Sequence, residues 1–170
     1  MSEKNDVINN LRAQLKGAHD WLEGTLMGVD DALANDVPPA GKVATIGANY
    51  AHVTTAEDYF VNVMLKGGAP LMMSMNPGIS EPPPMGTWGE WGRGVKADIG
   101  AQRAYAQKVY ESVDAHLATL SDAALAKEIE TPVGKMPLGQ FIGLWVLNAH
   151  CHAGEISTLK GLKGLQGYPG

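Results

Sequence analysis

The chain has 170 residues, 45% hydrophobic and 18% charged, which are ordinary proportions for a globular protein and enough length for one domain. Its net charge of −5 and its scattered basic residues argue against nucleic-acid binding. Residues 1–6 are polar, and no apolar run approaches the roughly 20 residues that a membrane span needs, so we expect a cytoplasmic protein without membrane contact.

Two amphipathic helices are predicted in the first part of the chain. Apolar residues recur at three- and four-residue steps over residues 11–33, and this helix should end before Pro38. A second helix over residues 46–64 should stop at Gly67, because glycine readily adopts the left-handed conformation that ends helices. The inward side chains of this second helix are expected to be Ile46, Asn49, Tyr50, Val53, Phe60 and Met64.

Residues 67–94 are rich in proline and glycine and predict a long crossover. A connection of this length is uncommon without a function such as lining a pocket or covering an interface, and the alternative is a packed connector between two parallel helices. The side chains that could wall a pocket are Met72, Met73, Met75, Met85, Trp88 and Trp91.

The C-terminal half predicts two further helices. One runs from near Val95 to Leu120, and a tight turn around Gly134 precedes another that starts at Pro137. No strand of useful length is expected, and residues 163–170 should form a flexible tail. The sequence therefore predicts a single all-α domain, a four-helix bundle with a long crossover between its second and third helices.

The last helix carries the most informative residues. His152 and Asn148 lie one turn apart, about 40° around the helix axis, on its apolar stripe. Buried polar side chains must be hydrogen-bonded or bind something, so the two would form a polar pair or a metal site. His150 lies about 200° from His152 and should point away. The single cysteine, Cys151, has no basic neighbour and is expected to serve packing.

Other helices could complete a site around His152. His52 lies in the middle of the second helix, and His19 borders the core stripe of the first. Glu155, one turn beyond His152, could orient its imidazole, bind a metal itself or act as a general base.

Two segments resemble the DinB-like superfamily of bacterial four-helix bundles. Residues 46–52, followed by Ala56 and Glu57, are similar to that family's pattern around a metal-binding histidine of the second helix. Residues 152–156 resemble its closing His-Arg-Gly-Gln-Ile pattern, with Ala153 in place of Arg and Glu155 in place of Gln. The long crossover and the Thr-Pro-x-Gly turn at residues 131–134 extend the resemblance over almost the whole chain.

The resemblance implies a divalent metal (Zn, Ni or Mn) held by His52, position 148 and His152. Position 148 is Asn here, where the family usually has His or an acidic residue, and an amide oxygen is a poor ligand for zinc or nickel. Three alternatives follow. Glu155, Glu57 or His19 completes the metal shell, or Asn148 contacts a metal-bound water, or the site is metal-free with Asn148 and His152 as a buried polar pair.

The resemblance also implies an activity. Relatives include S-transferases that use bacillithiol or mycothiol and a mycothiol-dependent maleylpyruvate isomerase, and they are often dimers. A metal-dependent transferase or hydrolase acting on a small molecule is therefore expected, with a low-molecular-weight thiol as a cofactor candidate, Glu155 as catalytic candidate and a homodimer as its assembly. The competing hypothesis is a non-enzymatic binding or stress-associated bundle with a degenerate metal site.

Overall fold

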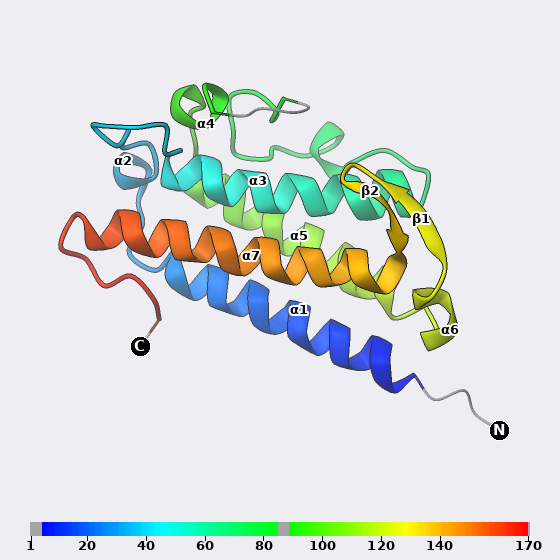
Figure 1. Ribbon diagram of the computed structural model, residues 1–170. Helices are drawn as coiled ribbons and strands as arrows, with labels where there is room; N and C mark the ends of the chain where they lie inside the picture. The colour runs from blue at the N-terminus through cyan, green and yellow to red at the C-terminus, as the bar shows by residue number, and fades with distance from the viewer. Residues whose placement is uncertain (1–4, 85–88, 170) are drawn as a thin grey trace.

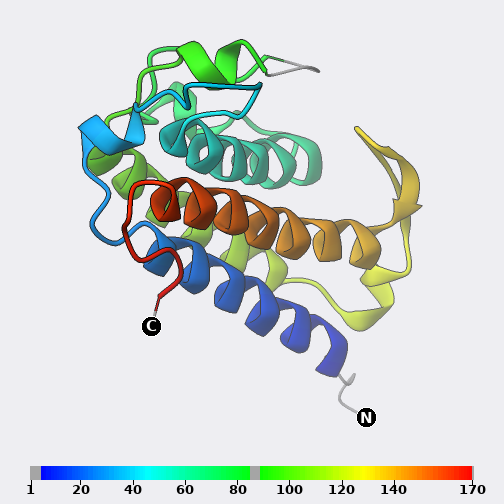
Figure 2. The same ribbon diagram turned by 60° about the vertical axis from the view of Figure 1, so that its left-hand side comes forward.

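Four long helices dominate the computed structural model, which describes residues 5–84 and 89–169 (Figure 1). The predicted all-α bundle with a long crossover between its second and third helices is confirmed. In both views α3, α7 and α1 lie side by side, and α5 closes the bundle behind them (Figures 1 and 2). The long helices are α1 (Asp6–Thr25), α3 (Ile46–Asp58) with its extension η1 (Tyr59–Leu65), α5 (Ile99–Leu117) and α7 (Leu138–Gly161).

The connections hold short elements. These are α2 (Asp31–Ala34), the 3₁₀ turn η2 (Leu71–Met73), α4 (Trp91–Gly94), α6 (Asp122–Leu125), and the strands β1 (Glu128–Thr131) and β2 (Gly134–Pro137). Inside the bundle, the largest fully buried apolar and aromatic side chains are Trp145, Tyr50, Tyr105, Ile8, Leu22, Leu26, Ile46, Leu117, Ile142 and Ile156. No helix of the described residues is both long and apolar enough to cross a membrane.

The first helix is shorter than its apolar stripe predicted. It ends at Thr25, and Gly28 (φ 76°) takes the left-handed conformation before α2 begins. The expected continuous helix to residue 33 is therefore wrong. Lys160 of α7 donates from its buried ammonium to the carbonyls of Thr25 and Met27, where a cation satisfies the open C-terminal end of α1.

The second long helix changes type halfway along its length. Thr45 caps α3 by accepting the Ala48 amide, and from Tyr59 onward the chain forms the π-helical turns of η1. The i→i+5 bonding of a π-helix shifts the phase of the side chains that follow. Val61 and Asn62 are consequently the buried residues of η1, while the predicted Phe60 and Met64 are only partly buried.

Asp58 stands at this change of helix type and is fully buried. Its carboxylate accepts from the Asn62 amide (2.7 Å), the Tyr105 hydroxyl (2.6 Å) and the backbone N–H groups of Leu71 (2.9 Å) and Met72 (3.1 Å). One carboxylate thereby joins α3, η1, α5 and the start of the crossover. These four hydrogen bonds offset the cost of removing the carboxylate from water.

The crossover packs against α3. The Trp91 ring is buried beside Ala48 and Ala51, and its indole N–H donates to the Glu81 carbonyl (3.0 Å). Met72 and Met75 pack partly buried against the core, whereas Met73 is 78% exposed. The other two candidates for a pocket wall, Met85 and Trp88, lie outside the described residues.

One expectation for the C-terminal part requires correction. A small antiparallel hairpin, β1–β2, occupies the segment where no strand was expected, and it pairs Ile129 with Met136 over the core. The segment from residue 163, which was expected to form a flexible tail, lies against α1, where Pro169 contacts Gly24. There Tyr168 packs beside Trp21 of α1, with ring centroids 5.5 Å apart.

Replacing Asp58 by alanine should destabilise the fold by about 3 kcal/mol, because it leaves two backbone donors and a tyrosine hydroxyl buried without their acceptor. Asp114→Ala, which removes an exposed partner of Arg12, is the matched control and should lose less than about 1 kcal/mol. Urea unfolding followed by circular dichroism measures both. Equal losses in the two variants would contradict the role of Asp58.

Candidate functional site

His52 of α3 and His152 of α7 meet between their helices. Their ring centroids lie 4.9 Å apart with the planes at 67°. His152 is buried and His52 is partly buried. Two imidazoles that bind one ion at about 2.1 Å in tetrahedral geometry have ring centres roughly 5 Å apart, so the observed separation suits a shared ion. The structure brings together the two histidines that the sequence singled out.

The orientation of the His152 ring is fixed by two acceptors. Nδ1 lies 2.9 Å from Oδ1 of Asn49 and 2.8 Å from Oε2 of Glu155. The Asn49 amide nitrogen donates to the Thr45 carbonyl (3.0 Å), which assigns its oxygen to the side facing His152. Since both neighbours of Nδ1 are acceptors, Nδ1 carries a proton, and in the neutral ring the lone pair is therefore on Nε2. This tautomer is the one that a metal-binding histidine adopts when its other nitrogen is held by a carboxylate or carbonyl.

Electrostatics keep His52 neutral at physiological pH. Burial, the larger cause, and the neighbouring His152 lower the pKa of His52 to about 4, and Glu155 opposes the shift. The hydrogen bond from His152, in turn, lowers the pKa of Glu155. Metal binding requires neutral imidazoles, so this environment favours the ligating form of His52.

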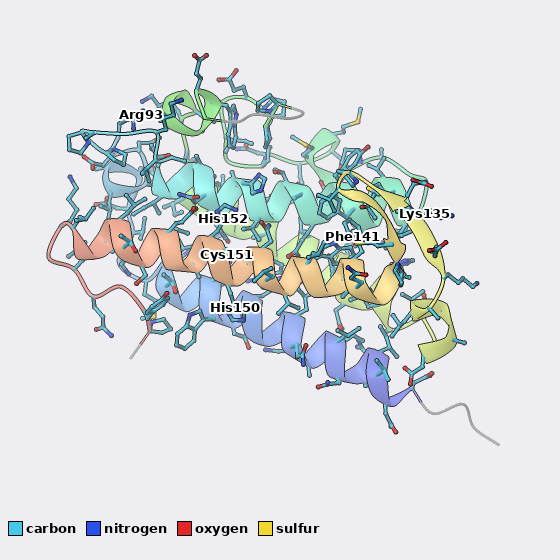
Figure 3. All side chains as sticks on the ribbon, in the orientation of Figure 1. Arg93, Lys135, Phe141, His150, Cys151 and His152 are labelled. Atoms are coloured by element: carbon cyan, nitrogen blue, oxygen red, sulfur yellow. The ribbon has the colours of Figure 1, made fainter. Side chains whose placement is uncertain are left out.

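The other residues predicted on α7 are arranged differently from expectation. Asn148 is only partly buried, and no hydrogen bond joins its side chain to another described residue. His150 is exposed as expected, but Cys151 is exposed rather than packed. Glu155 has a half-exposed side chain. Figure 3 shows His152 on the side of α7 that faces α3, with His150 turned toward α1.

Asn49 is the residue whose role the sequence did not predict. It was placed on the inward stripe of the second helix, while Asn148 was named as the polar partner of His152. The structure gives that part to Asn49, because it lies one turn before His52 on the same helix and faces α7. The signal that could have found it is the i, i+3 spacing of Asn49 and His52.

His19 and Glu57, two further candidates for the metal shell, are bonded to one another. The His19 Nε2 lies 2.8 Å from Oε2 of Glu57, and both side chains are buried. Among the described residues no group of three His, Cys, Asp or Glu side chains is placed to hold a metal ion. The donor set between α3 and α7 therefore consists of two imidazoles, with the Asn148 amide one turn away.

The sequence profile of the DinB superfamily matches residues 9–156. The chain belongs to the DinB superfamily. No protein with a curated description matches it. The crystal structure of a conserved protein from Enterococcus faecalis is similar, with a TM-score of 0.75 and 17% sequence identity, and the likeness covers 89% of this chain and 94% of the other. At that identity the similarity shows a shared fold only.

The partly buried His52 of this DinB superfamily member should make the stability of the metal-free protein depend on pH. Its pKa is about 4 in the folded protein and 6.5 ordinarily, so between these values the unfolded chain binds more protons. Stability should therefore fall as the pH decreases from about 6.5 toward 4. Urea unfolding with a chelator present should show a weaker pH dependence in His52→Gln and an unchanged one in His150→Gln, which alters an exposed histidine. An unaltered slope in His52→Gln would contradict the pKa assigned to this ring.

Proposed function

We propose that this protein binds a divalent metal ion through His52 and His152 and uses it in a transfer or hydrolysis reaction on a small molecule. The observation that carries the proposal is the pair of rings at 4.9 Å, with His152 held through Nδ1 by Asn49 and Glu155. An imidazole held in this way has a fixed tautomer and a more basic Nε2, both of which favour coordination.

Asn148 is the residue available for a third position. It lies one turn before His152 and is partly exposed. As a neutral amide it is a weaker ligand for zinc or nickel than the imidazole or carboxylate usual in catalytic sites. A site built on two strong ligands leaves several positions for water and substrate, at the expense of metal affinity.

The chain's own residues supply orientation and proton handling at this site. A bound divalent ion supplies Lewis acidity, which polarises a substrate oxygen or lowers the pKa of bound water or thiol. Asn49 holds the His152 ring from the buried side, and Glu155 holds it from the solvent side. Because Glu155 is half-exposed and ionised, it is also placed to accept a proton from a substrate that approaches over α7. A low-molecular-weight thiol is the co-substrate in the transferase form of the proposal.

A second candidate is a non-enzymatic bundle whose metal site has degenerated. The observation that favours it is the donor set, in which Asn148 stands where a third strong ligand would complete the site. The two candidates differ in metal content.

Metal analysis of protein purified without a histidine tag separates them. We expect about one equivalent of a divalent metal in the unaltered protein and no metal in His52→Ala or His152→Ala. A catalytic metal site usually has about three protein ligands, and this site has only two strong ones, so the loss of either should abolish binding. His150→Ala, which removes an exposed histidine of the same helix, is the control and should keep the metal. Protein that takes up no metal from excess zinc, nickel or manganese would overturn the proposal in favour of the non-enzymatic bundle.

Asn49→Ala tests the role of the buried acceptor. Loss of this hydrogen bond should weaken metal affinity by about 10- to 100-fold while His52 and His152 remain in place. Competition with a chromogenic chelator measures the affinity, and circular dichroism checks the fold. His150→Ala, which removes an exposed histidine of α7, is the comparison and should keep its metal affinity. An unchanged metal affinity in Asn49→Ala would contradict the positioning role of Asn49.

A further inference from the structure

A second concave site lies on another part of the bundle. A cleft of about 540 Å³ lies between α1 and α5, away from the contact between α3 and α7. Its apolar lining includes Ala13, Leu15, Val113 and Leu117, and the polar His19 and Tyr110 join that lining. The volume suits a small molecule. None of the residues of the His52–His152 site lines it.

His19 connects this cleft to a carboxylate buried in the core. Glu57 reaches from α3 to the His19 Nε2 at 2.8 Å and is only 1% exposed. Its other oxygen, Oε1, is buried without a hydrogen-bond partner among the described residues. A buried carboxylate with so little compensation is costly, and such groups are retained where they serve a site. The only hydrogen bond of Glu57's side chain within the described part of the chain is to a histidine that lines a cleft.

The hydrogen bond between His19 and Glu57 determines which nitrogen of His19 can accept a hydrogen bond from a ligand. With the Nε2 proton directed at the Glu57 carboxylate, the lone pair of the neutral ring lies on Nδ1. Nδ1 makes no hydrogen bond to a described residue and is not among the buried unpartnered atoms. The Tyr110 ring stacks on His19 with centroids 3.8 Å apart and planes at 17°, which fixes the imidazole. His19 is thus a rigid acceptor backed by a buried negative charge.

The charged residues that line the cleft determine whether it favours an anionic or a cationic ligand. The two basic residues of the lining are already paired, Arg12 with Asp114 at 2.8 Å and Lys16 with Asp20 at 2.6 Å. Glu57 adds a negative charge behind the lining. An anion would therefore meet no unpaired cation on the described walls of the cleft, whereas a positively charged donor gains from both His19 and the carboxylate behind it.

We propose that the α1–α5 cleft is a second binding site, which takes a small organic amine in its ammonium form with Nδ1 of His19 as the acceptor. The ammonium N–H donates to Nδ1, and Glu57 balances the charge through the imidazole. The apolar body of the amine lies against Ala13 and the Tyr110 ring, which are the more exposed apolar parts of the lining. This site is independent of the metal proposed between α3 and α7.

Three probes of one shape test the assignment in the unaltered protein. Benzylamine, benzyl alcohol and benzoate are titrated at about pH 7, where the amine is protonated and benzoate is an anion, and binding is followed by amide NMR shifts. Benzylamine should shift the signals of His19 and Tyr110 saturably. Benzyl alcohol should bind at least about tenfold more weakly, since it lacks the charge. The proposal is overturned if benzylamine gives no saturable shift at the cleft, or if benzoate binds there as tightly.

Two charge variants and one metal-site variant complete the test. Glu57→Gln keeps the size and an acceptor for His19 but removes the charge, and should weaken benzylamine binding at least about tenfold. Glu111→Gln, which removes an equal charge from an exposed rim residue paired with Lys108, should change it less than about twofold because solvent screens it. His52→Ala should leave benzylamine binding unchanged even where it abolishes metal binding. Equal effects of the two charge variants, or loss of binding in His52→Ala, would reject the cleft as the amine site.

Discussion

The buried polar side chains of α3 impose the constraint on which the rest of the structure depends. This helix is buried over most of its surface, so each polar group on it must find a partner inside the protein. Asn49 pairs with His152 on α7, Glu57 with His19 on α1, and Asp58 with Tyr105 on α5. Three partners on three helices fix both the rotation of α3 and its position along its axis. A rotation that improved one pair would break another, and this places His52 against His152 with little freedom.

Much of this arrangement follows from helical periodicity alone. The four long helices, the inward direction of His152, the outward direction of His150 and the meeting of His52 with His152 were all predicted from spacing or resemblance, and the structure agrees. The hydrophobic period predicts these directions because it describes how side chains are distributed around the axis of a single helix. The choice of Asn49 over Asn148 as the partner of His152 depends on how two helices are rotated against each other, and a single sequence carries little information about that.

The errors have local causes. Gly28 ended the first helix early because a left-handed residue interrupted an apolar stripe that continued into α2. The π-helical turns of η1 shifted the phase after Asp58, so extrapolating the regular period predicted Phe60 in place of Val61. The β1 and β2 strands are too short for an alternation to be recognised. Cys151 was assigned to packing from its chemistry, although its position 100° from His152 permitted exposure.

The geometry of α3 also keeps the two candidate sites apart. His52 and Glu57 are five positions apart, which is about 140° around a helix, so one helix presents them to different neighbours. Asn49 serves the first site and Glu57 the second, and no side chain of the described residues is hydrogen-bonded to both His152 and His19. The buried hydrogen bonds of Asn49, Glu57 and Asp58 hold α3 to three other helices. We therefore expect α3 to move as one rigid unit between the two candidate sites. A ligand in the α1–α5 cleft could therefore influence the proposed metal site by moving α3, which would strain the Asp58 contacts first, or by moving α1 against α7, with which it packs.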